Sequence, residues 1–215
     1  MSIAQRYQQD GYVHLRQFIP VPVAQAFLHQ LDGDLQEMGA DWTRLEKAQP
    51  LLARPAAEVY GFHYAPLITF LWGMTPAISL LLGRELLPTY SYFRLYRAGD
   101  VCHVHSDRPS CEHSLSLTLA YSEEKPWALE MGARHLAQPQ SGIANGFGDE
   151  PFSAVSMRPG GAVLYQGVHR RHGRTTPNPN RWSAHLFLHW VDPAGPYAAH
   201  AFDGRTLPPA SDLRF

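Results

Sequence analysis

The chain has 215 residues, a formal net charge of −1 at pH 7 and 45% hydrophobic residues, which is typical of a globular protein with one sizeable core. The balanced charge gives no electrostatic footprint for a polynucleotide or an acidic membrane, so we expect neither as a partner. We expect one domain over residues 1–215. The first residues lack the apolar stretch of a secretion signal and there are only two cysteines, Cys102 and Cys111, which predicts a cytoplasmic location.

Residues 1–89 are predicted to be mainly helical. A short helix is expected over residues 2–10, stopped by Gly11, and an entry strand over residues 12–15. A longer helix is expected after Pro20, because apolar residues recur at spacing four, and it ends near Gly39. Residues 41–49 predict another short helix.

The most apolar segment, residues 67–82, contains Gly73, Thr75 and Pro76. Thr75 followed by Pro76 predicts a helix start, with Gly83 as the matching stop. A segment broken in this way is shorter than the roughly 20 residues that a bilayer requires, so it predicts a core element and no membrane span.

From residue 90 the pattern changes to short strands separated by turns. Strands are expected over residues 90–96, 101–107, 114–121, 155–157, 162–165 and 184–191. Helices followed by many short strands predict an α+β fold, with a helical layer packed on an antiparallel barrel or jelly roll formed by residues 90–191. Residues 133–153 predict a lid, and residues 192–215 predict an irregular C-terminal tail.

A possible metal site lies at the end of the second predicted strand. His105 and Asp107 alternate there, so both side chains face the same way. A third ligand is available after a later strand, where both His169 and His172 are candidates. Two histidines and one carboxylate form the ligand set of non-haem Fe(II) oxygenases, although His-x-Asp alone is a weak signal in a chain with twelve histidines.

Arg181 and Ser183 lead into the last predicted strand and share one face there. A guanidinium offers two hydrogen bonds to a carboxylate and the hydroxyl offers a third. The pair therefore predicts a site for an organic acid.

In this order, His105, Asp107, His172 and Arg181 resemble the motif of the Fe(II)/2-oxoglutarate-dependent dioxygenase superfamily, whose members share a double-stranded β-helix (jelly-roll, cupin-like) core. The superfamily pattern is His-x-Asp, a distal His, and a basic residue nine to eleven positions after it. Arg181 follows His172 by nine positions and His169 by twelve, so the resemblance favours His172.

This resemblance implies Fe(II), 2-oxoglutarate and O2 as cofactors and cosubstrates. It implies that Arg181 and Ser183 hold the distal carboxylate of 2-oxoglutarate, and that Tyr96, in Tyr-x-x-Gly, contacts the cosubstrate. The implied reaction is hydroxylation with release of succinate and CO2, with desaturation or cyclisation as variants. Halogenating members lack the carboxylate that Asp107 supplies, and members that repair nucleic acid carry a second arginine where this chain has Phe187.

The substrate is expected to be a small molecule, such as an amino acid or a biosynthetic intermediate. Arg108 and Arg174 lie beside predicted ligands and would suit an anionic substrate group, and Glu112 would suit an amine; structural ion pairing is the alternative for all three. The alternative function is a cupin-like metal-binding or sensor barrel without oxygenase activity. The sequence gives no indication of the oligomeric state.

Overall fold

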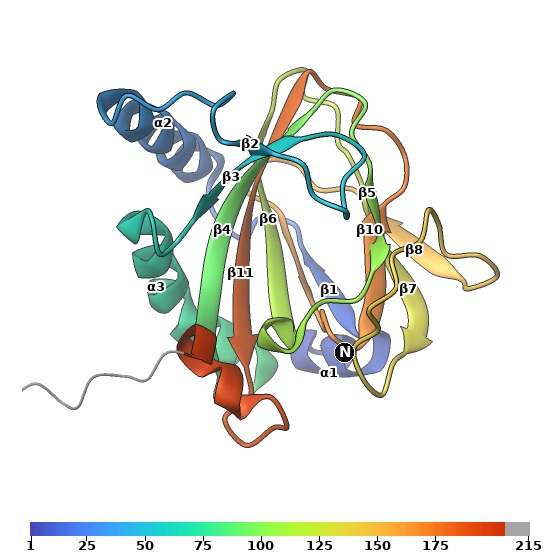
Figure 1. The fold of residues 1–215 in the computed structure, drawn as a ribbon. Helices are drawn as coiled ribbons and strands as arrows, with labels where there is room; N and C mark the ends of the chain where they lie inside the picture. The colour runs from blue at the N-terminus through green and yellow to red at the C-terminus, as the bar shows by residue number, and fades with distance from the viewer. Residues whose placement is uncertain (205–215) are drawn as a thin grey trace, which may run out of the picture.

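The computed structural model describes residues 1–204 and shows two antiparallel sheets facing each other, with helices on the outside of the larger sheet (Figure 1). The larger sheet has the strand order β1 (Tyr12–Leu15), β9 (Ala162–Tyr165), β6 (His113–Tyr121), β11 (Trp182–Val191), β4 (Leu87–Arg97), β3 (Ala56–Tyr60), β2 (Glu46–Lys47). The smaller sheet has the order β5 (Cys102–His105), β10 (Arg170–Arg174), β7 (Leu129–His135), β8 (Phe152–Val155). The predicted α+β architecture is confirmed.

The helices are α1 (Ile3–Asp10), α2 (Val21–Glu37) and α3 (Ala65–Leu82), with short 3-10 segments η1 (Pro109–Cys111) and η2 (Ala198–Gly204). Ser2 begins α1 with a capping box, in which its hydroxyl accepts the N–H of Gln5 and the Gln5 side chain accepts the N–H of Ser2. Gly11 ends α1 in the left-handed region, at φ 77°.

α3 differs from its prediction. It is one continuous helix of 18 residues that passes through Thr75 and Pro76 and ends at Gly83 as predicted. Thr75 does not cap a helix start, because its hydroxyl donates to the Leu71 carbonyl one turn earlier and accepts the indole N–H of Trp190. By length and composition this helix alone, among residues 1–204, is apolar enough to cross a membrane.

The main core lies between the larger sheet and the helices that cover it. On β4, Phe93 and Leu95 point outward into this core, while Tyr92, Arg94 and Tyr96 point inward toward the smaller sheet. Apolar residues of α2 and α3 fill the outer layer: Ala24, Leu31, Leu35, Leu67, Leu71, Ile78, Leu82. The space between the two sheets therefore receives the polar and aromatic side chains of the strands.

Several predicted elements need correction. Residues 41–49 form turns and β2 rather than a helix, and β3 was also not predicted, so residues 1–89 contribute three strands to the larger sheet. β7 and β10 were not predicted either, and β7 occupies the start of the expected irregular segment 133–153. The predicted irregular tail contains η2, and its residues 205–215 lie outside the described part of the chain.

Candidate metal centre

The structure brings His105, Asp107 and His172 together between the two sheets. Strands β5 and β10 are antiparallel neighbours, and their register places His172 directly opposite His105. The Nε2 atoms of His105 and His172 lie 3.4 Å and 3.5 Å from Oδ1 of Asp107. One ligand atom from each of the three residues can lie within 4.8 Å of the other two, which is the spacing that a shared metal ion requires. We call these three residues the ligand cluster.

Hydrogen bonds to backbone carbonyls fix which ring nitrogen of each of the two histidines carries the hydrogen. Nδ1 of His105 donates to the carbonyl of His103 at 2.9 Å, and Nδ1 of His172 donates to the carbonyl of Arg170 at 2.9 Å. Because a carbonyl can only accept, each neutral ring carries its hydrogen on Nδ1 and has a lone pair on Nε2. Two such lone pairs and a carboxylate oxygen face one another, so the cluster fits a cation.

The pKa shifts agree with this arrangement. Burial alone would raise the pKa of Asp107, but the charge of His172 and hydrogen bonds with both histidines outweigh it and hold this pKa well below its usual value. Burial would lower the pKa of His172, but the charge of Asp107 raises it above its usual value. The pKa of His105 is lowered, chiefly by burial and then by the charge of His172. The buried Asp107 carboxylate therefore favours a positive charge beside it, which a metal ion would supply.

The second carboxylate oxygen of Asp107, Oδ2, is positioned by Ser114 and by close packing against Gly167. The Ser114 hydroxyl lies 3.2 Å from Asp107 Oδ2 and 2.9 Å from Nδ1 of His189. The backbone N–H of Asp107 donates to the carbonyl of Gly167. A Cβ at Gly167 would collide with Asp107 Oδ2 and with the Cys111 carbonyl, and would lie 2.7 Å from the Ser114 hydroxyl oxygen. Only glycine therefore leaves room for the carboxylate in this position.

Gly167→Ala is expected to weaken Fe(II) or Co(II) binding by roughly 10- to 100-fold, the usual cost of disturbing the support of a metal ligand. Isothermal titration calorimetry of the purified variant measures this directly, with circular dichroism as the check on folding. Gly146→Ala is the matched control, because nothing lies within 4 Å of a Cβ there. Unchanged affinity in Gly167→Ala would show that the carboxylate position does not depend on this glycine.

A second possible ligand group, Asp107, Cys111 and His189, shares Asp107 with the first. Burial raises the pKa of the Cys111 thiol well above its usual value, and the Tyr90 hydroxyl lies 3.1 Å from its sulfur. A protonated thiol is a poor metal ligand. The first cluster is therefore the better metal site.

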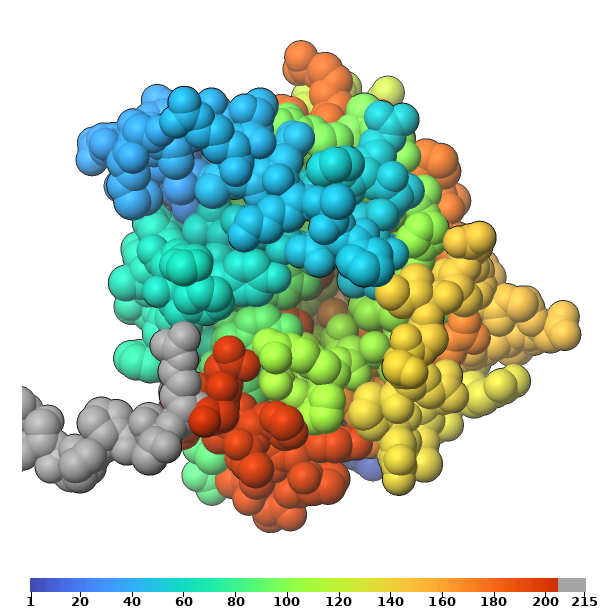
Figure 2. All heavy atoms as spheres, in the orientation of Figure 1, coloured from blue at the N-terminus to red at the C-terminus, as the bar shows by residue number. Residues whose placement is uncertain are grey.

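The ligand cluster opens onto a cleft of about 450 Å³. Figure 2 shows a hollow at the centre of the molecule's front face, bordered by segments from three separate parts of the chain. These segments supply the lining: Pro50 and Leu51; His105, Ser106, Asp107 and Arg108; Pro139, Gln140, Ser141, Gly142 and Ile143. The last segment belongs to the predicted lid, and it is joined to β5 by paired backbone hydrogen bonds between Val104 and Ala144.

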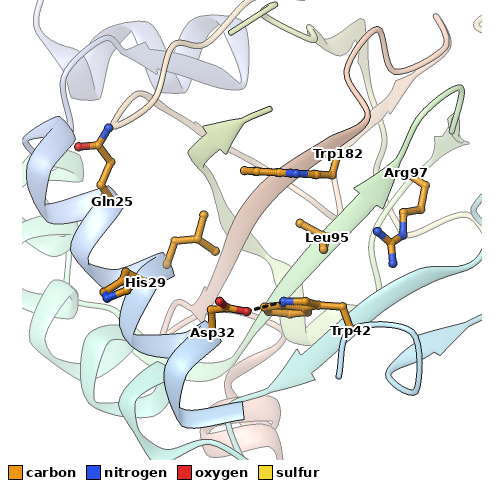
Figure 3. Close-up of a pocket in the computed structure, with 8 residues that line it drawn as sticks. Gln25, His29, Asp32, Trp42, Leu95, Arg97 and Trp182 are labelled. Carbon is orange, nitrogen blue, oxygen red and sulfur yellow. Dashed lines mark hydrogen bonds between the residues drawn. The ribbon is translucent and has the colours of Figure 1, made fainter. Parts of the chain in front are cut away.

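A groove of about 500 Å³ lies elsewhere, between α2 and strands β4 and β11 (Figure 3). Trp42, Leu95 and Trp182 line it, and the indole N–H of Trp42 donates to Asp32. Leu95 lies on the outer face of β4, whereas Arg94 and Tyr96 on either side of it face the ligand cluster's side of the sheet. The sheet therefore separates this groove from the candidate metal centre.

Tyr96 and Ser183, predicted to contact the cosubstrate, are both buried on the inner side of the larger sheet. The Tyr96 hydroxyl accepts an N–H of Arg94 at 3.0 Å, and no acceptor among the described residues takes its own hydrogen. The Ser183 hydroxyl accepts from the Asn178 side chain at 3.1 Å. Arg94 itself is neutralised by a buried ion pair with Glu58 at 2.6 Å.

Arg181 does not lie where the sequence pattern places it. It occupies a bend before the first residue of β11, its side chain is 79% exposed, and its guanidinium and backbone N–H both bind Glu123. The structure therefore does not bring Arg181 to the ligand cluster. Strand alternation, which predicted that Arg181 and Ser183 share a face, does not extend past the start of the strand.

Arg174, by contrast, is buried in the interior of the protein, whereas the sequence predicted that it would bind the substrate. It follows His172 by two residues on β10 and is 1% exposed. Its guanidinium donates to the Trp127 carbonyl, lies over the Trp127 ring at 4.8 Å and approaches Nδ1 of His185 at 3.5 Å. It forms no ion pair with any residue that the structure describes. A buried, unpaired guanidinium calls for an anion.

The other three predicted residues, Arg108, Glu112 and His169, lie in three different parts of the structure. Arg108 lines the cleft, lies over the Tyr90 ring at 4.3 Å and pairs with Asp203 at 3.3 Å. Glu112 does not line the cleft, and its carboxylate accepts the N–H of Asp192 beyond the end of β11. His169 donates from Nδ1 to the Leu136 carbonyl and is not among the grouped ligand residues.

No family model matches the chain, and neither does any curated protein. Solved structures do match the chain. The chain is 13% identical to the non-heme alpha ketoglutarate dependent carbocyclase SnoK from nogalamycin biosynthesis, with a TM-score of 0.67 over 88% of this chain and 83% of that one.

It is 16% identical to the epimerase SnoN in complex with Fe3+, alpha ketoglutarate and nogalamycin RO, with a TM-score of 0.66 over 99% of this chain and 92% of that one. It is 15% identical to a Pseudomonas putida prolyl-4-hydroxylase, with a TM-score of 0.60 over 88% of this chain and 97% of that one. The predicted double-stranded β-helix fold is thereby confirmed.

Proposed function

We propose that this protein is a non-haem Fe(II)/2-oxoglutarate-dependent oxygenase that hydroxylates a small organic molecule. The convergence of three acceptor atoms from His105, Asp107 and His172, beside an open cleft that the first two residues line, carries this proposal. When bound, Fe(II) and 2-oxoglutarate would supply the oxidising chemistry, and the protein would hold, orient and shield the reactants.

Arg174 is proposed to bind the distal carboxylate of 2-oxoglutarate, in place of Arg181. His172 and Arg174 are two residues apart on one strand, which separates them by about 7 Å, a distance that a five-carbon diacid can span. The carboxylate would supply the missing counter-charge, and the free hydrogen of the Tyr96 hydroxyl is available to the same group. Burial between the sheets excludes water from this contact, which strengthens it.

The substrate is proposed to enter from the cleft. Pro50, Leu51 and Ile143 give it apolar walls, and Arg108 gives it a cation beside Asp107. This lining suits a small, partly apolar molecule with an anionic group. The similar structures named above include a carbocyclase, an epimerase and a hydroxylase, so cyclisation is a further outcome to consider for the same site.

Anaerobic reconstitution with Fe(II) and 2-oxoglutarate tests the proposal. We expect stoichiometric iron binding and a weak visible charge-transfer band that appears only when both are present, and slow succinate formation after O2 is admitted. Iron binding without the band would favour the cupin-like metal-binding or sensor barrel. Failure to bind iron at all would refute both functions.

A further inference from the structure

His185 is a buried histidine on the inner face of the larger sheet, and one of its ring nitrogens has no partner. It lies on β11, is 0% exposed, and is paired in register with Arg94 of β4 and Thr118 of β6. Its side chain meets Arg174 of β10, in the opposite sheet (Figure 1). Among residues 1–204, no group forms a hydrogen bond with its Nε2. Buried polar groups are nearly always hydrogen-bonded, so this nitrogen requires an explanation.

The contacts of the other ring nitrogen show that Nε2 is a donor. The guanidinium of Arg174 lies 3.5 Å from Nδ1 of His185, and the Thr118 hydroxyl lies 3.3 Å from it. A guanidinium can only donate, so Nδ1 accepts and the ring hydrogen is on Nε2. Burial, and then the charges of Arg174 and Arg94, lower the pKa of His185 well below its usual value, so the ring is neutral. Nε2 is therefore a fixed N–H donor.

Two further donors lie beside this one. Arg174 is 1% exposed and has no ionic partner in the described part of the chain. Tyr96 is also 1% exposed, and its ring meets that of His185 edge to face at 5.6 Å between centroids. The Tyr96 hydroxyl accepts from Arg94, so its own hydrogen is free. One cation and two neutral donors, all buried and all short of an acceptor, form a site for an anion.

We propose that His185 donates its Nε2 hydrogen to the distal carboxylate of 2-oxoglutarate, as a third donor beside Arg174 and Tyr96. This inference rests on the proposed function and extends it. A carboxylate has about four lone-pair sites, so it can accept from all three side chains at once. They come from three different strands, β4, β10 and β11, which surround the group from both sheets. The pocket is thereby specific for a dicarboxylate, because a 2-oxo acid without the second carboxylate leaves its donors unpaired.

The aromatic rings around His185 are the alternative partners for this N–H. The ring centroids of Tyr121 and Trp127 lie 5.8 Å and 6.3 Å from that of His185. An N–H that points at an aromatic face forms only a weak bond, whereas a carboxylate is a charged acceptor. The two alternatives differ in one measurable respect: only the bond to the carboxylate depends on which 2-oxo acid is bound.

Anaerobic titration of the Fe(II) protein with 2-oxoglutarate, followed by the charge-transfer band, tests the inference in wild type, His185→Asn and His185→Gln. The amide of glutamine reaches about as far as Nε2 and keeps a donor there, whereas that of asparagine reaches only as far as Nδ1. His185→Asn is expected to raise the dissociation constant roughly 10- to 100-fold, the usual cost of one hydrogen bond to a charged group. His185→Gln is the matched control and is expected to stay within about threefold of wild type.

2-Oxopentanoate, which has the same carbon chain without the distal carboxylate, is the ligand control. It is expected to bind wild type and both variants within about twofold of one another, because it offers His185 no acceptor. Unchanged 2-oxoglutarate affinity in His185→Asn would overturn the inference, as would an equal loss for both acids, which would mean that the histidine only supports the fold. A wild type that binds iron but gives no band with either acid would refute the proposed function, and this inference with it.

Discussion

His172→Ala is expected to abolish stable Fe(II) binding, whereas His169→Ala is expected to leave it unchanged. His172 supplies one of three converging acceptor atoms, and without it only two ligands remain. Disturbing the support of a ligand already costs roughly 10- to 100-fold in affinity, so removing a ligand is expected to cost more than that. His169 instead donates to the Leu136 carbonyl and stacks with His135 at 5.1 Å.

Anaerobic metal titration with Fe(II), followed by elemental analysis after desalting, measures this difference. Both variants remove one histidine from the same short segment, so His169→Ala controls for nonspecific metal binding and for disturbance of the loop before β10. Equal losses in the two variants would contradict the assignment. A loss in His169→Ala alone would make His169 the ligand.

Arg174→Met is expected to raise the dissociation constant for 2-oxoglutarate by at least roughly 30-fold, with Fe(II) binding retained. Truncating one partner of a buried, hydrogen-bonded charge pair costs about 2–5 kcal/mol, and each 1.4 kcal/mol is tenfold. Arg181→Met is the matched control. It removes the same cation from a side chain that is 79% exposed and bound to Glu123, so an effect within about twofold is expected.

Two measurements separate these variants without a known substrate. The charge-transfer band, titrated with 2-oxoglutarate under anaerobic conditions, gives the affinity. The melting temperature of the Fe(II) form should rise with 2-oxoglutarate in wild type and in Arg181→Met, but much less in Arg174→Met. The opposite pattern, with the loss confined to Arg181→Met, would restore the role that the sequence motif gives to Arg181.

The sequence indicated the strands, the turns and the pair His105 and Asp107 because those signals are local, whereas His172 was favoured over His169 only by the resemblance to the oxygenase superfamily. Alternation places His105 and Asp107 on one side of an extended chain, and turn residues separate the strands. The proposed role of Arg174 was not visible in the sequence, because burial and the lack of an ionic partner are properties of the assembled sheets. A signal was present, however, since Arg174 follows His172 at the same spacing at which Asp107 follows His105.

The misplaced elements have physical causes as well. β10 reads Arg-Arg-His-Gly-Arg and has no large apolar residue, since His172 and Arg174 are buried polar side chains and Arg171 pairs with Glu150. Such a strand lacks the alternation on which prediction depends. α3 continues through Pro76 because its buried residues pack both before and after that position, at Leu67, Leu71, Ile78 and Leu82. Packing along the whole helix outweighs the hydrogen bond that proline cannot donate.

The pairing of His105 with His172 also has a consequence for stability. The two strands that carry the ligands are neighbours in space, yet Asp107 and His172 are 65 positions apart in the chain. A bound ion would act as a cross-link between distant segments, and the site cannot exist before those segments meet. Ligand present at a hundred times its dissociation constant stabilises a folded protein by about 2.7 kcal/mol. Metal binding would therefore stabilise the pairing of β5 with β10 in the smaller sheet.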